Sequence, residues 1–135
     1  AAGSATDAMA RVLAQELAAR LGQNVVVDNR AGAFGQIAAV HVARAAPDGY
    51  TLFVTTNTTH SANPHLYRGL PYDPLKDFEP VARTATLPFM LVVGPAFPAR
   101  TAREWLEQAR ARPGEVTFAT ASSTSLVAAR TAARL

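Results

Sequence analysis

The sequence predicts an α/β fold built on a mainly parallel sheet. Strand-length apolar runs alternate with helical patterns along the 135 residues, which is typical of right-handed βαβ units. Three loops rich in small and hydroxyl-bearing residues, AGSATD, TTNTTHSAN and ATASSTS, each precede a predicted helix. In open α/β sheets such loops gather at the carboxyl ends of the strands, where ligands bind.

The first part of the chain predicts two helices and a strand. Apolar residues from Met9 to Leu21 recur at helical spacing, and Gly22 follows where a left-handed residue ends a helix. The β-branched run NVVVD (24–28) predicts a buried strand. After the turn NRAGAFGQ, an alanine-rich helix over 37–45 is ended by the turn PDGY.

The rest of the chain continues the alternation. The predicted strands are TLFVTT (51–56), LPFMLVVGP (87–95) and EVTFAT (115–120). The predicted helices are a short piece at 65–68, one opened by a capping box of Thr101 and Glu104, and a last one from Leu126 to Leu135. Pro71, Pro74 and Pro80 exclude regular structure between them and predict a surface linker.

Composition and charge exclude several classes of function. With 49% hydrophobic and 17% charged residues, the composition is globular. The net charge of +3 comes from arginines spread along the chain, so no nucleic-acid partner is expected. The absence of cysteine excludes disulfides, thiol catalysis and cysteine-ligated zinc.

Enzyme and cofactor motifs are missing from the sequence. There is no G-x-G-x-x-G, no G-x-x-x-x-G-K-[ST], no H-E-x-x-H and no G-x-S-x-G. We therefore predict no catalytic residue, no metal ligand and no cofactor. Among the histidines, His60 is the best candidate for a ligand contact, whereas His41 fits a packed or surface position in its helix.

The helix starts themselves indicate an anion site. Amides at helix N-termini are unpaired and carry partial positive charge, so several such ends around one crevice suit a carboxylate. A purely structural role for the first loop, as a helix cap, stays open as well. Ser4 with Asp7, or Thr6 alone, would cap the first helix whatever the protein did.

Four stretches carry a resemblance to a known family. They are AGSATDAMARVLAQELAARLGQNVVVDNRAGAFGQIAA, AAPDGYTLFVTT, NPHLYRGLPYDPLKDFEPVA and WLEQARARPGEVTFATASS. In this order they resemble the Bug (TctC-like) family, the periplasmic solute-binding proteins of tripartite tricarboxylate transporters. Most specific are PDGYTL, the LPYDP-KDF-PV stretch and the VVVDNR-GA-G turn.

The resemblance implies an architecture, a location and partners. Family members are two-domain, Venus-flytrap-like proteins of the periplasmic-binding-protein type II class, which capture small carboxylates and deliver them to a membrane permease. By position, residues 1–84 would form most of the first domain, without its first strand, and residues 85–135 the start of the second. The implied partners are a small mono- or dicarboxylate and the membrane permease subunits, and the implied location is the periplasm.

The resemblance also implies the ligand-binding residues, which lie in the three loops. The family holds a carboxylate there through main-chain amides, hydroxyls and ordered water. Carried over by position, the set is Gly3, Ser4, Ala5, Thr6, Asp7, Thr56, Asn57, Thr58, Thr59, His60, Asn63, Ala121, Ser122, Ser123 and Thr124.

The chain departs from the family pattern in sequence and in length. Phe34 and Ala38 stand where members commonly have glycine, and Ser4 replaces a frequent glycine; Phe34 would narrow the pocket or line it against a flat ligand. Members are well over twice as long, so we expect a fragment or truncated member whose incomplete sheet self-associates. Two other functions stay open: a small α/β hydrolase using His60, Asp7 or a serine, and an interaction module without small-molecule chemistry.

Overall fold

The computed structural model describes residues 1–132 and 134. The chain divides into two compact units, Ala1–Pro80 and Val81–Leu135, which are described separately. This division falls close to the domain boundary expected after residue 84, and the assignment of the two parts to two domains remains a prediction.

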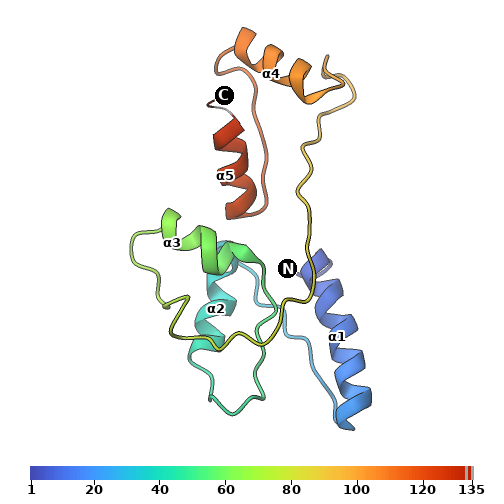
Figure 1. The fold of residues 1–135 in the computed structure, drawn as a ribbon, viewed down its shortest axis with the longest axis vertical. Coiled ribbons are helices and arrows are strands. Elements are labelled where there is room, and N and C mark those ends of the chain that lie inside the picture. The colour runs from blue at the N-terminus through green and yellow to red at the C-terminus, as the bar shows by residue number, and fades with distance from the viewer. Residues whose placement is uncertain (133, 135) are drawn as a thin grey trace. The chain divides into compact units, whose positions relative to one another are not determined.

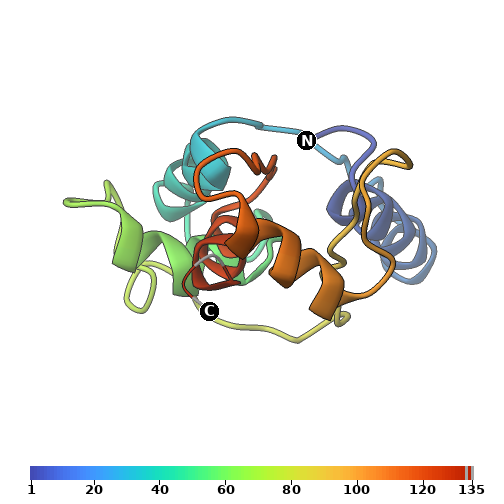
Figure 2. The same ribbon diagram turned by 90° about the horizontal axis from the view of Figure 1, so that it is seen from above.

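The first unit carries five helical segments, of which α1, α2 and α3 are labelled in Figure 1. They are α1 (Ala5–Leu21), η1 (Ala33–Gly35), α2 (Gln36–Ala43), η2 (Thr58–Ala62) and α3 (Asn63–Leu66). The views in Figures 1 and 2 agree that α2 and the continuous η2–α3 segment lie side by side. The turn η1 joins them, because it contacts η2 and runs directly into α2.

The helix α1 begins and ends at the residues that the sequence indicates. Its N-cap is Ser4, whose Oγ accepts a hydrogen bond from the Asp7 amide at 3.2 Å. Its last turn ends at Gly22, whose φ of 64° is left-handed and whose amide donates to the Ala18 carbonyl. Of the two capping alternatives, the structure therefore adopts the one that uses Ser4 and Asp7.

The next two helices are displaced slightly from their predicted ranges. The predicted 37–45 helix is α2, which ends at Ala43. The predicted 65–68 piece is α3, which begins two residues earlier because Pro64 occupies the first helical turn, where its missing amide costs nothing. Tyr67 is already extended, so the prediction that the helix reaches residue 68 is wrong.

The second unit contains α4 (Ala102–Ala111) and α5 (Ser123–Ala132). At the start of α4, Thr101 Oγ1 accepts from the Glu104 amide at 3.2 Å, as the capping-box pattern predicts. Glu104 Oε2 in turn accepts a hydrogen bond from the Arg100 amide at 2.7 Å. The helix α5 begins at Ser123 rather than Leu126 because the serine-rich loop enters the helix directly, and part of its predicted end lies outside the described residues.

The predicted parallel sheet is not confirmed, since no β-strand occurs among the described residues. The ranges 24–28, 51–56, 87–93 and 116–120 are extended segments without ladder partners. Val25 and Val27 line a hollow with α1, while Val26 is 85% exposed, so the prediction of a buried strand over 24–28 is wrong: side chains on one side of the segment face solvent. A strand is defined by hydrogen bonds to a neighbour, and its own residues cannot supply them.

Few apolar side chains are buried in the part of the chain that the structure describes. The buried apolar residues are Ala14, Ala39, Tyr72 and Ala99. Large apolar side chains in the extended segments are exposed, including Leu52, Met90 and Val92. No described helix has both the length and the apolar character needed to cross a membrane.

Candidate functional site

The buried polar residues of the described chain all lie in the three predicted loops. They are Asp7, Thr58, Thr59, Asn63 and Ser123. A buried polar side chain is tolerated only where hydrogen bonds replace its lost water, and no side-chain polar atom in the described residues is buried without a partner. Internal hydrogen bonds therefore fix the loops that the sequence singles out.

Asp7 fixes the first loop through both of its carboxylate oxygens. Oδ2 accepts a hydrogen bond from the Gly3 amide at 2.8 Å. Oδ1 accepts from Asn29 Nδ2 at 2.8 Å and pairs with Arg11 Nε at 3.1 Å. The carboxylate thus ties the loop before α1 to the chain that follows the extended 24–28 segment.

The same contacts keep the Asp7 carboxylate ionised. The hydrogen bond from Asn29, followed by those from Gly3 and Arg11, lowers the pKa of Asp7 from 3.8 to about 2. Its position in the first turn of α1 also favours negative charge. Because protein donors occupy both oxygens, Asp7 acts on the loop by holding Gly3 in place.

The other first-loop residues surround this anchor. Gly3 and Ala5 are exposed, while Ser4 and Thr6 are partly buried. The Ser4 amide donates to the Ala1 carbonyl at 3.1 Å, and the Ala8 amide donates to the Ser4 carbonyl at 2.9 Å. The exposed residues of the loop, Gly3 and Ala5, therefore lie at the start of a 17-residue helix.

The second loop is organised around Thr59. It lies in the π-helical turn η2, a geometry that is frequent at functional sites. Thr59 Oγ1 lies 2.8 Å from Thr55 Oγ1 and 2.9 Å from His60 Nδ1. Its carbonyl accepts a hydrogen bond from the buried Tyr72 hydroxyl at 2.7 Å. Contacts from before and after the turn thus hold it on both sides.

His60 lies in a cluster of aromatic rings. Its ring centroid is 4.9 Å from that of Phe78, in an edge-on arrangement, and 6.1 Å from that of Phe53. Burial lowers the pKa of His60 below 6.5, so the ring is neutral at pH 7. Its packing among these rings and its bond to Thr59 make His60 a structural support of the second loop.

Asn63 connects the second loop to the turn before α2. It is fully buried, and its Nδ2 donates to the Phe34 carbonyl at 3.1 Å. In the preceding segment, the Thr58 amide approaches Thr56 Oγ1 at 3.4 Å, while Thr56 and Asn57 are exposed. The predicted residues 56–60 and 63 therefore form one continuous, hydrogen-bonded structure.

The third loop lies in the second unit and is built on hydroxyl contacts. Ser122 Oγ lies 2.8 Å from Ser125 Oγ, which also contacts Thr120 Oγ1. The Leu126 amide donates to the Ser122 carbonyl at 3.0 Å. Ser123 is fully buried, Thr124 is partly buried and Ala121 is exposed, so the loop enters α5 with little freedom.

Several residues that support the loops were not predicted. Asn29, Arg11, Thr55, Phe53, Tyr72 and Phe78 all contact predicted residues. Asn29 follows a predicted strand, where a polar residue is a signal for the ligand edge of a sheet, and Tyr72 lies in the family stretch LPYDP. The structure groups the first two loops in one unit and the third in the other.

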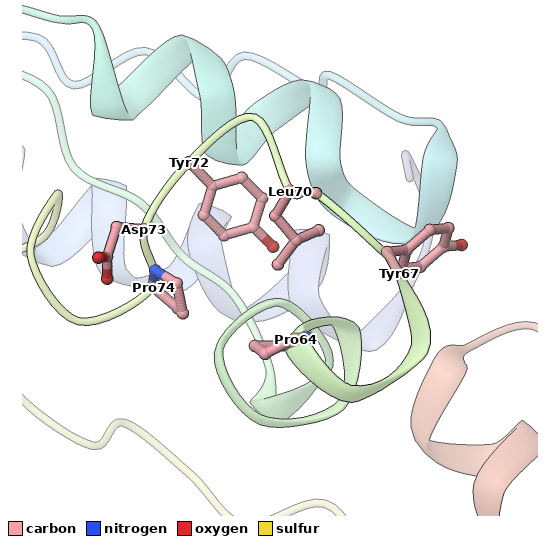
Figure 3. Close-up of a pocket in the computed structure, with 7 residues that line it drawn as sticks. Pro64, Tyr67, Leu70, Tyr72, Asp73 and Pro74 are labelled. Carbon is pink, nitrogen blue, oxygen red and sulfur yellow. The ribbon is translucent and has the colours of Figure 1, made fainter.

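A pocket in the first unit lies outside these loops. Figure 3 shows this hollow of about 550 Å³, formed where α3 meets the loop after it. Its lining residues are Pro64, Tyr67, Gly69, Leu70, Tyr72, Asp73 and Pro74. None of the predicted binding residues lines it. In addition, no group of three metal-ligating side chains occurs among the described residues.

Comparison with known proteins decides the family. The sequence model of TctC, described as the tripartite tricarboxylate transporter family receptor, matches residues 9–133. The chain belongs to this family. The match includes most of the first loop's helix, the whole second loop and the third loop, so the resemblance drawn from the sequence is confirmed.

Relatives of this TctC-family chain are similar over most of its length. It is 43% identical to a UPF0065 protein of Bordetella bronchiseptica over 93% of the chain and 37% of the relative. It is 43% identical to protein BugT of Bordetella pertussis over 87% of the chain and 36% of the relative. A solved structure titled as that of a periplasmic transporter superposes with a TM-score of 0.77 at 40% identity, over 90% of this chain and 41% of the other.

These comparisons indicate the fold and show how much of each matched protein the chain covers. The structural match is consistent with the periplasmic-binding-protein-like architecture expected from the sequence. The chain spans about two fifths of the length of the proteins it matches. What a whole receptor of this family does is therefore a matter of proposal for this chain.

Proposed function

We propose that the chain binds a small carboxylate in the periplasm for delivery to the permease subunits of a tripartite transporter, without a catalytic step. Membership of a transporter receptor family supports a role in solute binding. The single observation that carries the proposal is that every buried polar residue of the described chain lies in the three loops. Such loops hold a fixed shape before any solute arrives, which reduces the entropic cost of binding.

The chemistry of these loops favours an anion. The first loop enters the 17-residue helix α1, whose N-terminus carries partial positive charge and favours a negatively charged group. The fixed negative charge of Asp7 is already matched by Arg11 and by the Gly3 and Asn29 donors. We propose that main-chain amides of the loops provide the remaining contacts, as the family resemblance implies.

Among the described residues, the hydrolase alternative has one candidate pair, formed by Thr59 and His60. Their side chains are within hydrogen-bond distance, as a nucleophile and a base would be. However, Thr59 is only 2% exposed and its oxygen also contacts Thr55, so the hydroxyl is closed to a substrate. We therefore favour binding over hydrolysis.

Isothermal titration calorimetry of the 135-residue chain tests the proposal. Acetate, succinate and benzoate are compared with acetamide, succinamide and benzamide, which match them in shape but lack the charge. We expect heat of binding from at least one acid and none from its amide. Binding of the amides without binding of the acids would refute the anion site.

A matched pair of variants tests whether the second loop is responsible. Thr59→Val keeps the shape of the side chain but removes the hydroxyl that contacts Thr55 and His60. Thr131→Val removes a hydroxyl that only bonds to Val127 along the exposed surface of α5. We expect Thr59→Val to weaken carboxylate binding by loosening the second loop, and Thr131→Val to leave the affinity unchanged. Equal affinities in the two variants would mean that the Thr59 hydroxyl does not hold the loop in its binding shape.

A further inference from the structure

The turn before α2 holds two non-glycine residues in a left-handed conformation. Ala33 has a φ of 44° and Phe34 a φ of 51°, and Gly32 and Gly35 on either side also have positive φ. A side chain at such angles is strained, and for a residue as large as phenylalanine the conformation is rare. Strain of this kind persists only where its surroundings enforce it, and it clusters at functional sites.

The proposed binding loop is what enforces this conformation. The fully buried Asn63 donates through Nδ2 to the Phe34 carbonyl at 3.1 Å. The backbone of Gly35 packs so closely on the second loop that an added Cβ would lie 2.8 Å from Thr59 Cγ2. Phe34 is therefore held by the same segment that carries Thr59 and Asn63.

The contacts of the Phe34 ring do not explain why a phenylalanine occupies this strained position. The residue is 38% exposed, and none of the ring contacts among the described residues involves it. Glycine at this position would adopt the same backbone without strain. The chain instead keeps a large, partly exposed ring beside a loop that otherwise offers hydroxyls and amides.

We propose that Phe34 determines specificity by packing against the body of the bound solute, and that the solute is a carboxylate with a flat aromatic ring. This inference rests on the proposed carboxylate site, which would hold the charged end, while Phe34 receives the ring. Aromatic pairs gain from offset or edge-on contact beyond the burial of their surface. Such a contact corresponds to about a two- to ten-fold gain in affinity over an aliphatic acid.

Three variants and two probes test the inference by calorimetry on the 135-residue chain. Benzoate and propionate carry the same charge and differ in the ring. Phe34→Gly relieves the strain and removes the ring, while Ala33→Gly relieves the same kind of strain and keeps the ring. Phe34→Asn is a second ring-free variant, because asparagine tolerates the left-handed region; thermal unfolding identifies the variants that fold.

We expect the native chain and Ala33→Gly to bind benzoate about two- to ten-fold more tightly than propionate. Phe34→Gly and Phe34→Asn should bind the two acids about equally. If propionate binds all four proteins but the preference for benzoate survives loss of the ring, Phe34 does not determine specificity and the carboxylate site stands. If neither acid binds the native chain, the aromatic-carboxylate inference fails, and the titrations with acetate and succinate decide whether the carboxylate site itself stands.

Discussion

Asp7 shows how one side chain prepares a loop for binding. Its two oxygens accept from the Gly3 amide in the loop and from Asn29 on a distant part of the chain. The Arg11 guanidinium balances its charge from one helical turn away. Hydrogen bonds to an ionised group are stronger than those between neutral groups, so this anchor holds the loop before α1.

The first prediction concerns the stability that Asp7 provides. In Asp7→Asn, an NH₂ group replaces one carboxylate oxygen and faces a hydrogen-bond donor that the oxygen had accepted from. We therefore expect a lower free energy of unfolding at pH 7. Because the pKa of Asp7 falls from 3.8 unfolded to about 2 folded, its contribution is complete above about pH 4 and is lost as the pH falls toward 2. Urea unfolding from pH 7 to pH 2 measures both effects.

Asp28→Asn is the matched control for this experiment. Asp28 pairs only with Arg30 at 2.7 Å, and both side chains are well exposed. Exposed ion pairs contribute little, so we expect a change below about 1 kcal/mol. An equal loss of stability in the two variants would contradict the assigned role of Asp7.

The sequence indicates the local half of this anchor and not the distant half. Ser4 and Asp7 stand three residues apart before an apolar stripe, a spacing that identifies a helix start. Asn29 meets Asp7 only after the chain turns back, and no local pattern encodes that contact. The aromatic support of His60 was missed for the same reason, since Phe78 is far along the chain.

At the scale of elements, helices were predicted well and strands were not. Thr101 and Gly22 mark helix ends because caps depend on neighbouring residues alone. The extended segments 24–28 and 51–56 have strand-like sequences, yet each needs a hydrogen-bonded neighbour to become a strand. Strand formation is therefore a property of the assembled sheet, which a single segment cannot fix.

The second prediction concerns the contact between η1 and η2. Gly35→Ala places a methyl group 2.8 Å from Thr59 Cγ2 at a φ of 85°, whereas Gly49→Ala has a similar φ of 81° and open space around it. We expect Gly49→Ala to cost about 1 kcal/mol through backbone strain. Gly35→Ala should cost about 1–3 kcal/mol more because Thr59 must move.

Urea unfolding gives both free energies, and calorimetry with the carboxylate probe shows whether the second loop has moved. We expect Gly35→Ala alone to weaken binding, because its strain is transmitted to Thr59. Equal costs for the two variants would mean that the turn and the loop do not pack as described.

At the scale of the whole molecule, the chain carries loops with buried polar anchors and extended segments with exposed apolar side chains. Met90 and Val92 are 82% and 79% exposed, and no strand among the described residues covers them. Exposed extended segments of this kind favour pairing with another chain. Self-association through them stays a prediction, while the loops alone carry the binding proposal.

Nitrogen-15 NMR of the 135-residue chain during titration with benzoate and benzamide tests the central claim most directly. Under the proposal, benzoate shifts the amides of residues 3–7 and 56–60 in the first unit along one common binding curve, and benzamide leaves them in place. Amide shifts confined to other residues, or the same shifts with benzamide, would contradict a carboxylate site formed by these loops.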